Sequence, residues 1–219
     1  MDKYKIKKLI GNKPNPILME IGCADGKDTQ EFINIFNDTN FKMYCFEPDQ
    51  RNVRKFKEDI RDNRVVLYEY VVGDVNGLVD FYKSTKSSSG EELIYSSSLR
   101  EPGEKLFEIW KQFEGKFIKV QSQSITLDYF VNAKDISYID FVWLDVQGCE
   151  DMVIKGGINT FKDKVQYLYT EYSNQEIYKG EPNLFEILKM LPNYSIIEIF
   201  SNLTGDREGG DILLKNNSL

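Results

Sequence analysis

The sequence predicts an α/β fold, in which a mostly parallel sheet has helices on both faces and ends in an antiparallel hairpin. Apolar segments of strand length alternate with segments of helical periodicity. The last two apolar segments are joined by a polar turn without a helix. With 219 residues, 41% of them hydrophobic, the chain is expected to form a single domain over residues 1–219.

Residues 17–72 predict a β-α-β-α-β unit with parallel strands, because right-handed crossovers join neighbouring parallel strands. The expected strands are Ile17–Gly22, Met43–Glu47 and Val65–Val72. A helix over Asp28–Asn37 follows the first strand, and Pro48 and Asp49 open a second helix after the next strand.

The segment from Asp74 to Tyr138 interrupts this alternation, since connections in α/β domains usually have only ~2–6 residues. Within it we expect a mobile Ser- and Gly-rich stretch over Ser84–Ser98, a helix over Pro102–Phe113 that stops at Gly115, an extra strand over Phe117–Ile125 and a short helix starting at Thr126. Long insertions in compact domains are often functional, so residues 84–124 are predicted to form a lid.

The alternation then returns and ends in the hairpin. The expected elements are a strand over Ile139–Asp145, a helix over Glu150–Lys155, a strand over Val165–Glu171, a helix over Leu184–Leu191, and hairpin strands over Tyr194–Phe200 and Ile212–Leu214.

Composition excludes several classes of function. The chain has no histidine, which removes the commonest general base and transition-metal ligand. Its net charge of −7 disfavours binding to nucleic acid. The cysteines Cys23, Cys45 and Cys149 are too far apart for a zinc site or a disulfide framework. No apolar stretch reaches the ~20 residues of a membrane span, which indicates a cytoplasmic protein.

Acidic residues and glycines follow the first three predicted strands, where ligands bind to open parallel sheets. Gly22, Asp25 and Gly26 follow the first strand, without the GxGxxG spacing of pyrophosphate binders. Glu47 ends the second strand at a spacing typical of ribose recognition, and Asp74 follows the third, where it could accept from an adenine amino group. Together they favour a nucleoside ligand; the alternative is ordinary turn glycines and exposed carboxylates.

Three runs of residues resemble the FkbM-type methyltransferases. They are Glu20 to Gly26, Cys45 to Pro48, and above all Leu144 to Glu150 with the following Val153 to Gly157. The resemblance covers about Ile17 to Leu214. It implies the class I S-adenosylmethionine-dependent fold, a Rossmann-like seven-stranded sheet with a C-terminal antiparallel hairpin. Gln147 departs from the family, where this position is more commonly Glu.

The resemblance also implies a role for each strand-end residue. Gly22, Asp25 and Gly26 would hold the methionine half of S-adenosyl-L-methionine, with Glu20 beside them. Glu47 would bind the ribose hydroxyls and Asp74 the adenine. Acidic residues around this ligand also suit its positive sulfonium.

Three further carboxylates are candidates for catalysis. Asp145 and Glu171 end neighbouring strands, so both are expected to face one cleft, with Glu150 lining it. Asp145 would act as the base or as an oxygen ligand of a divalent ion, with Glu171 assisting, and a hard ion such as Mg²⁺ fits this oxygen set. Alternatively, Asp145 caps the following helix and Glu150 stabilises its first turn.

The family generally methylates hydroxyls of sugars, glycans or natural products, so the resemblance implies an O-methyltransferase with a sugar, glycan or other small-molecule acceptor. Tyr95, Trp110, Tyr172 and Tyr178 are candidates for stacking on a sugar, although an aromatic residue at helical spacing, such as Trp110, is more often part of the core. The alternatives are a non-catalytic module that binds S-adenosylmethionine, which Gln147 favours, and a nicotinamide-dependent oxidoreductase. The sequence does not indicate an oligomeric state.

Overall fold

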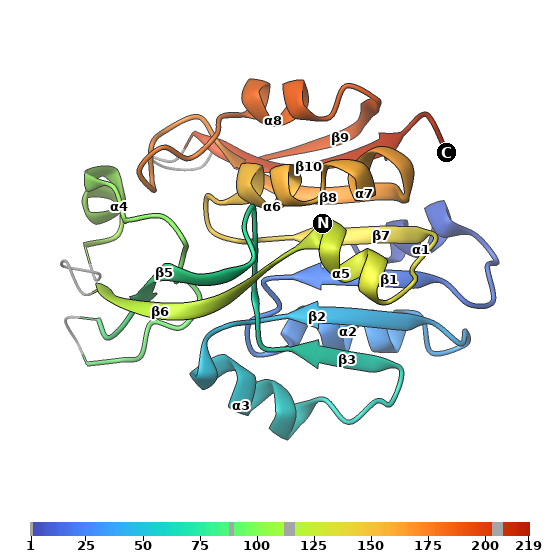
Figure 1. Ribbon diagram of the computed structural model, residues 1–219, viewed down its shortest axis with the longest axis horizontal. Coiled ribbons are helices and arrows are strands. Elements are labelled where there is room, and N and C mark those ends of the chain that lie inside the picture. Colours follow the sequence, from blue (N-terminus) through green and yellow to red (C-terminus); the bar gives the residue numbers. More distant parts are fainter. Residues whose placement is uncertain (1, 88–89, 112–116, 203–207) are drawn as a thin grey trace.

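A seven-stranded sheet forms the centre of the molecule (Figure 1). The computed structural model describes residues 2–87, 90–111, 117–202 and 208–219. The strand order is β3-β2-β1-β7-β8-β10-β9, and only β10 runs antiparallel to its neighbours. The strands are β1 (Ile17–Ile21), β2 (Lys42–Phe46), β3 (Val65–Tyr68), β7 (Ile139–Leu144), β8 (Val165–Ser173), β9 (Tyr194–Asn202) and β10 (Gly209–Asn216). This order confirms the predicted α/β fold with its C-terminal antiparallel hairpin.

Helices cover both faces of this sheet (Figure 1). Successive side chains of a strand point to opposite faces, so Leu18 packs under one set of helices while Met19 and Ile21 pack under the other. The first set is α1 (Tyr4–Ile10), α2 (Lys27–Ile35) and α3 (Gln50–Asp59); the second is α5 (Leu127–Ala133), α6 (Glu150–Gly156), α7 (Ile158–Asp163) and α8 (Leu184–Met190). The central strands β1 and β7 are therefore buried on both sides.

A second, three-stranded sheet lies beyond the carboxyl ends of the parallel strands (Figure 1). It consists of β4 (Val71–Gly73), β6 (Phe117–Thr126) and β5 (Gly77–Ser84), in that order, and α4 (Glu104–Ile109) lies between β5 and β6 in the chain. The insertion predicted from the sequence thus adds a second sheet and a helix at the edge where the ligand was expected.

The predicted strand Val65–Val72 is wrong in one respect, because it is two strands in two different sheets. β3 ends at Tyr68, and Val71 begins β4, which pairs in parallel with Ser124 of β6. Gly156 of α6 packs directly against this strand, since a Cβ atom there would lie 1.9 Å from the Gly73 carbonyl oxygen. The break could not be predicted from the sequence, because the apolar residues continue across it.

The predicted helix over Pro102–Phe113 is shorter in the structure. It begins at Glu104, with Gly103 as an N-cap of extended backbone conformation whose amide donates to the Ile177 carbonyl oxygen at 2.8 Å. Phe113 and Gly115 lie outside the described residues, as does most of the polar turn between β9 and β10. The helices α1 and α7 have no counterpart in the sequence prediction.

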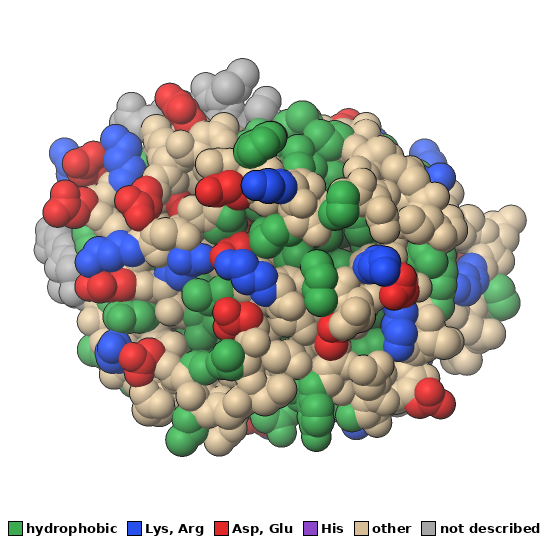
Figure 2. Space-filling model, turned by 45° about the horizontal axis from the view of Figure 1, so that its top comes forward, with side chains coloured by type: hydrophobic (Ala, Val, Ile, Leu, Met, Phe, Trp, Pro, Cys, Tyr) green, Lys and Arg blue, Asp and Glu red, His purple; other side chains and the backbone are tan. Residues whose placement is uncertain are grey.

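The surface shows no large region of one charge on the face in Figure 2. Among the described side chains on this face, Lys and Arg alternate with Asp and Glu. No helix in the described parts of the chain is long and apolar enough to cross a membrane.

Candidate active site

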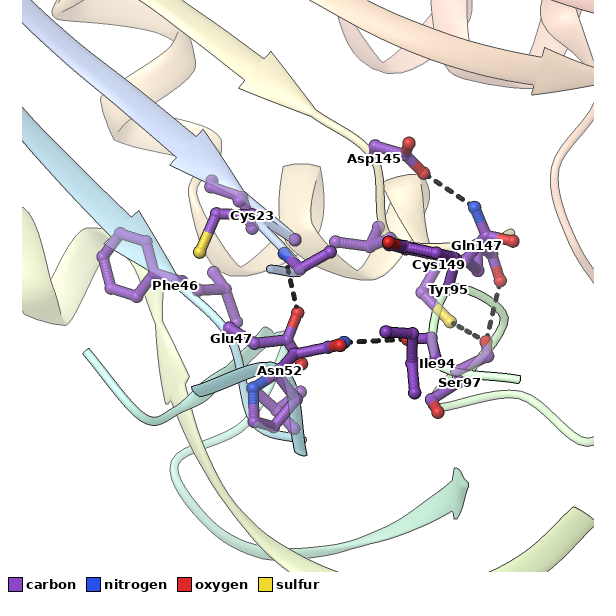
Figure 3. A pocket seen from close by; sticks show the side chains of 18 of the residues that line it. Cys23, Phe46, Glu47, Asn52, Ile94, Tyr95, Ser97, Asp145, Gln147 and Cys149 are labelled. Carbon is purple, nitrogen blue, oxygen red and sulfur yellow. Dashed lines mark hydrogen bonds between the residues drawn. The ribbon is translucent and has the colours of Figure 1, made fainter. Parts of the chain in front are cut away.

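A cavity of about 220 Å³ lies at the carboxyl ends of β1, β2 and β7 (Figure 3). Its floor is the loop after β1, where Gly22, Ala24 and Gly26 all have positive φ. Positive φ is uncommon for a residue such as Ala24 and marks backbone held in an unusual shape by its surroundings. At Gly22 a Cβ atom would lie 1.8 Å from the Asp145 carbonyl oxygen, so only glycine lets the ends of β1 and β7 approach this closely.

Glu47 lies on one side of this cavity, directly after β2. Its two carboxylate oxygens accept hydrogen bonds from the backbone amides of Ala24, at 3.0 Å, and Asp49, at 2.7 Å. The side chain is only 6% exposed, and this burial raises its pKa to about 7. The carboxylate is therefore fixed in position and can accept further hydrogen bonds from a ligand.

A segment of the insertion, residues 93–99, lines this cavity and a second one described below, and we call it the strap. The Tyr95 hydroxyl donates to Asp25 Oδ2 at 2.6 Å and accepts from Lys27 Nζ at 2.6 Å. The Asn52 amide donates to the Ile94 carbonyl oxygen at 2.7 Å. The strap is thus attached both to the loop after β1 and to α3.

A second cavity, of about 400 Å³, adjoins the first. Tyr95 and Gln147 line both cavities and form the wall between them. The remaining lining includes three aromatic side chains, Trp110, Tyr172 and Tyr178, and three carboxylates, Glu150, Glu171 and Glu181. Among the described residues that line it, none is Lys or Arg. This cavity offers stacking surfaces and hydrogen-bond acceptors to a polar ligand.

Gln147 lines both cavities, and Asp145 lines the first cavity beside it (Figure 3). Gln147 Nε2 donates to Asp145 Oδ1 at 2.8 Å, and the Tyr178 hydroxyl donates to Gln147 Oε1 at 3.3 Å. Gln147 has a φ of 55°, and Ser98 of the strap donates to its carbonyl oxygen at 2.7 Å. This network fixes the orientation of the Asp145 carboxylate.

Glu150 and Glu171 lie in the second cavity, as part of the same group of carboxylates. Burial raises the pKa of Glu150 well above its ordinary value, and the neighbouring charges of Glu171 and Asp145 raise it further. Glu150 Oε1 accepts from the Val146 amide at 3.3 Å. A proton bound by Glu150 removes its repulsion with the other two carboxylates.

The alternative role of Asp145 as a helix cap is wrong, because Cys149 is the N-cap of α6 and no side chain caps it. Glu150 is the first residue of α6, where a negatively charged side chain interacts favourably with the helix dipole. Glu150 is therefore both the first residue of this helix and a lining residue of the second cavity.

Glu20 does not line either cavity, although it was predicted beside the cofactor. Its side chain points to the same face of β1 as Leu18, toward α2, and is 1% exposed. The Thr29 hydroxyl donates to its carboxyl group. Glu20 thus joins β1 to α2 beneath the loop.

Asp74 is also outside both cavities, and its proposed adenine contact finds no support in the structure. The prediction took Val72 as the end of the third strand, but β3 ends at Tyr68 and Asp74 follows β4 of the other sheet. Asp74 is exposed there. Tyr70, Val71 and Val72 line the cavity instead.

The magnesium prediction for Asp145 and Glu171 likewise finds no support. In the described parts of the chain, no three Asp, Glu or Cys side chains converge in a geometry that could hold a metal ion. The two carboxylates lie in different cavities, with Asp145 in the first and Glu171 in the second.

The fold is that of the class I S-adenosylmethionine-dependent methyltransferases. Residues 20–196 match the family described as the methyltransferase FkbM domain. The chain belongs to the FkbM methyltransferase family. It is also 36% identical, over 209 residues, to the 2-O-methyltransferase NoeI of Sinorhizobium fredii, and this match covers 94% of the chain and 82% of NoeI.

Solved structures agree in fold at low sequence identity. A methyltransferase FkbM from Methylobacillus flagellatus has a TM-score of 0.56 and 13% identity over 92% of this chain, which spans only 44% of that longer protein. Magnesium protoporphyrin IX methyltransferase (ChlM) from Synechocystis, solved with bound S-adenosylmethionine, has a TM-score of 0.51 and 10% identity over 98% of this chain and 79% of its own. Membership of a methyltransferase family argues against the alternative of a nicotinamide-dependent oxidoreductase.

Proposed function

We propose that the protein is an O-methyltransferase that transfers the methyl group of S-adenosylmethionine to a hydroxyl of a sugar, glycan or other small molecule. The observation that carries this proposal is the arrangement of two adjoining cavities, in which Asp145 lines the first and is hydrogen-bonded to Gln147 of the wall between them. The similarity to a 2-O-methyltransferase supports a hydroxyl acceptor.

The first cavity is proposed to hold the cofactor. Gly22 and Asp25, which line this cavity, would surround its methionine half, with Gly26 next to them in the same loop, and the Glu47 carboxylate would accept from the ribose hydroxyls. The cleft-facing loop leaves room for backbone contacts, and both Glu47 oxygens keep a lone pair beyond their backbone hydrogen bonds. When bound, this cofactor supplies a methyl group activated by a positive sulfur.

The second cavity is proposed to hold the acceptor. Its aromatic side chains can pack on the apolar face of a sugar ring, while its carboxylates accept hydrogen bonds from hydroxyls. Asp145 would take the proton of the reacting hydroxyl as the acceptor oxygen forms its bond to the methyl carbon and the carbon–sulfur bond breaks. The products are a methyl ether and S-adenosylhomocysteine, with the proton on Asp145.

An acceptor screen tests this function directly. The purified protein is incubated with isotopically labelled S-adenosylmethionine and panels of sugar, oligosaccharide and phenol hydroxyl compounds, and methyl ethers are identified by mass spectrometry. We expect labelled methyl ethers of sugars. Cofactor binding without transfer to any hydroxyl, with or without Mg²⁺, would instead identify a non-catalytic binding module.

A further inference from the structure

Asn52 carries an acceptor atom that has no donor. It lies on the inner face of α3 beside Val53 and Phe56, is 2% exposed, and lines the first cavity. A polar side chain is unusual in this position. Within the described parts of the chain, Oδ1 of Asn52 has no hydrogen-bond partner although it is shielded from solvent. Buried polar atoms are nearly always paired, so an exception at a cavity points to a ligand donor.

The orientation of the amide follows from its other contact. Asn52 Nδ2 donates to the Ile94 carbonyl oxygen at 2.7 Å. Exchanging the two amide atoms would place Oδ1 against this carbonyl oxygen, and two acceptors cannot bond to each other. Oδ1 is therefore the atom left to face a donor from elsewhere.

The neighbouring carboxylate indicates which kind of donor this is. Glu47 lines the same cavity, and each of its oxygens already accepts one backbone amide. The ribose of S-adenosylmethionine carries two adjacent hydroxyls, which are both donors. Two adjacent hydroxyls match two acceptor side chains better than one carboxylate whose oxygens are partly occupied.

We propose that Asn52 Oδ1 accepts a hydrogen bond from a ribose hydroxyl of the bound cofactor and shares the ribose diol with Glu47. The inference rests on the proposed function, which places the cofactor in the first cavity. It also assigns Asn52 a second task. Because Nδ2 of the same amide holds Ile94, and Ile94 precedes Tyr95 at the wall between the cavities, one side chain links the ribose to the strap.

Calorimetric titration with S-adenosylhomocysteine and its 2′-deoxy and 3′-deoxy ribose analogues tests this assignment without an acceptor. For the wild type we expect each missing hydroxyl to weaken binding about 3- to 10-fold, the range of a single neutral hydrogen bond. In Asn52→Leu, which removes the acceptor at similar volume, one of the two deoxy analogues should bind within about twofold of the parent compound.

Three controls make the result specific. Lys55→Ala, at an exposed position of the same helix, should retain the wild-type loss for both analogues. Asn52→Ser serves as a second variant if the leucine variant does not unfold cooperatively. If the variant loses as much affinity as the wild type for both analogues, Asn52 does not bind the ribose, but the cavity can still be the cofactor site. If the wild type does not bind S-adenosylhomocysteine, the assignment of the cavity is wrong and this inference is wrong with it.

Discussion

Asp145 is the side chain on which the proposed chemistry depends most directly. Asp145→Asn preserves size and the site for the Gln147 amide but removes the ability to accept a proton at neutral pH. We expect methyl transfer to fall by roughly 10²- to 10⁴-fold, the contribution typical of a general base, while affinity for S-adenosylmethionine changes by no more than a few-fold. Single-turnover kinetics and calorimetry measure the two effects separately. Full activity of the variant would remove Asp145 from the mechanism.

Glu20 makes the stability of the fold depend on pH. Its burial raises its pKa from 4.5 to about 8, so between these values the folded chain holds a proton that the unfolded chain has lost. The free energy of unfolding therefore falls as pH rises through this interval, by about 1.4 kcal/mol per pH unit. Glu47, whose pKa is about 7, adds to this decrease in the free energy of unfolding only below about pH 7.

The variant Glu20→Gln keeps an acceptor for the Thr29 hydroxyl but cannot ionise. We expect it to flatten the fall in stability between pH 7 and 8, where Glu20 acts without Glu47. Urea unfolding at several pH values measures this, with the exposed Glu58→Gln as the matched control. A slope equal to that of the wild type would show that Glu20 is ionised in the folded protein.

Among the elements, the strap has contacts that the sequence did not reveal. Tyr95 joins it to Asp25 and Lys27, on the loop expected to hold the methionine half of the cofactor. Tyr95→Phe removes both hydrogen bonds and keeps the ring. We expect S-adenosylmethionine to dissociate about 3- to 10-fold faster, with little change in unfolding temperature because Tyr95 is 48% exposed. Stopped-flow displacement measures the rate.

The matched control for this change is Tyr129→Phe, on the exposed side of α5 and outside both cavities. It should leave the dissociation rate unchanged. If Tyr95→Phe also leaves the rate unchanged, the strap does not retain the cofactor through this side chain.

Elements with strong periodicity could be predicted from the sequence, and elements set by distant contacts could not. The strands of the central sheet are continuous apolar runs, which is typical of strands buried on both faces. The break between Tyr68 and Val71 depends on pairing with Ser124, more than fifty residues further along the chain. That missed break is why Asp74 was placed at the wrong strand end.

The same division holds for the site. The positions of Glu47, Asp145 and Gly22 in the first cavity could be predicted from the rule that ligands bind at the carboxyl ends of strands. Asn52 could have been noticed as a polar residue on the apolar face of a predicted helix, next to Val53 and Phe56. The position of Tyr95 could not be predicted, because it depends on contacts with Asp25 and Lys27 and not on the local sequence of the Ser-rich stretch.

At the scale of the whole molecule, charge is distributed so that the second cavity is acidic while the visible outer face is mixed (Figure 2). Glu150, Glu171 and Glu181 line this cavity, and its described lining contains no Lys or Arg. Like charges placed close together in a low-dielectric site repel each other strongly. We therefore expect neutral sugars to be methylated at least about tenfold more efficiently than their phosphorylated or carboxylated counterparts.

Competition between such matched pairs, with kcat/KM as the readout, tests this preference. Glu181→Gln should reduce the discrimination, since it removes one negative charge from the wall without touching Asp145. A preference for the anionic member of each pair would contradict the electrostatic argument and indicate a different acceptor site.

One wall, formed by Tyr95 and Gln147, belongs to both cavities. Whatever fills the first compartment therefore finishes the shape of the second, so the two reactants should enter in a compulsory sequence and leave in the reverse one. Product-inhibition patterns would then be competitive for S-adenosylhomocysteine against the methyl donor and non-competitive against the acceptor.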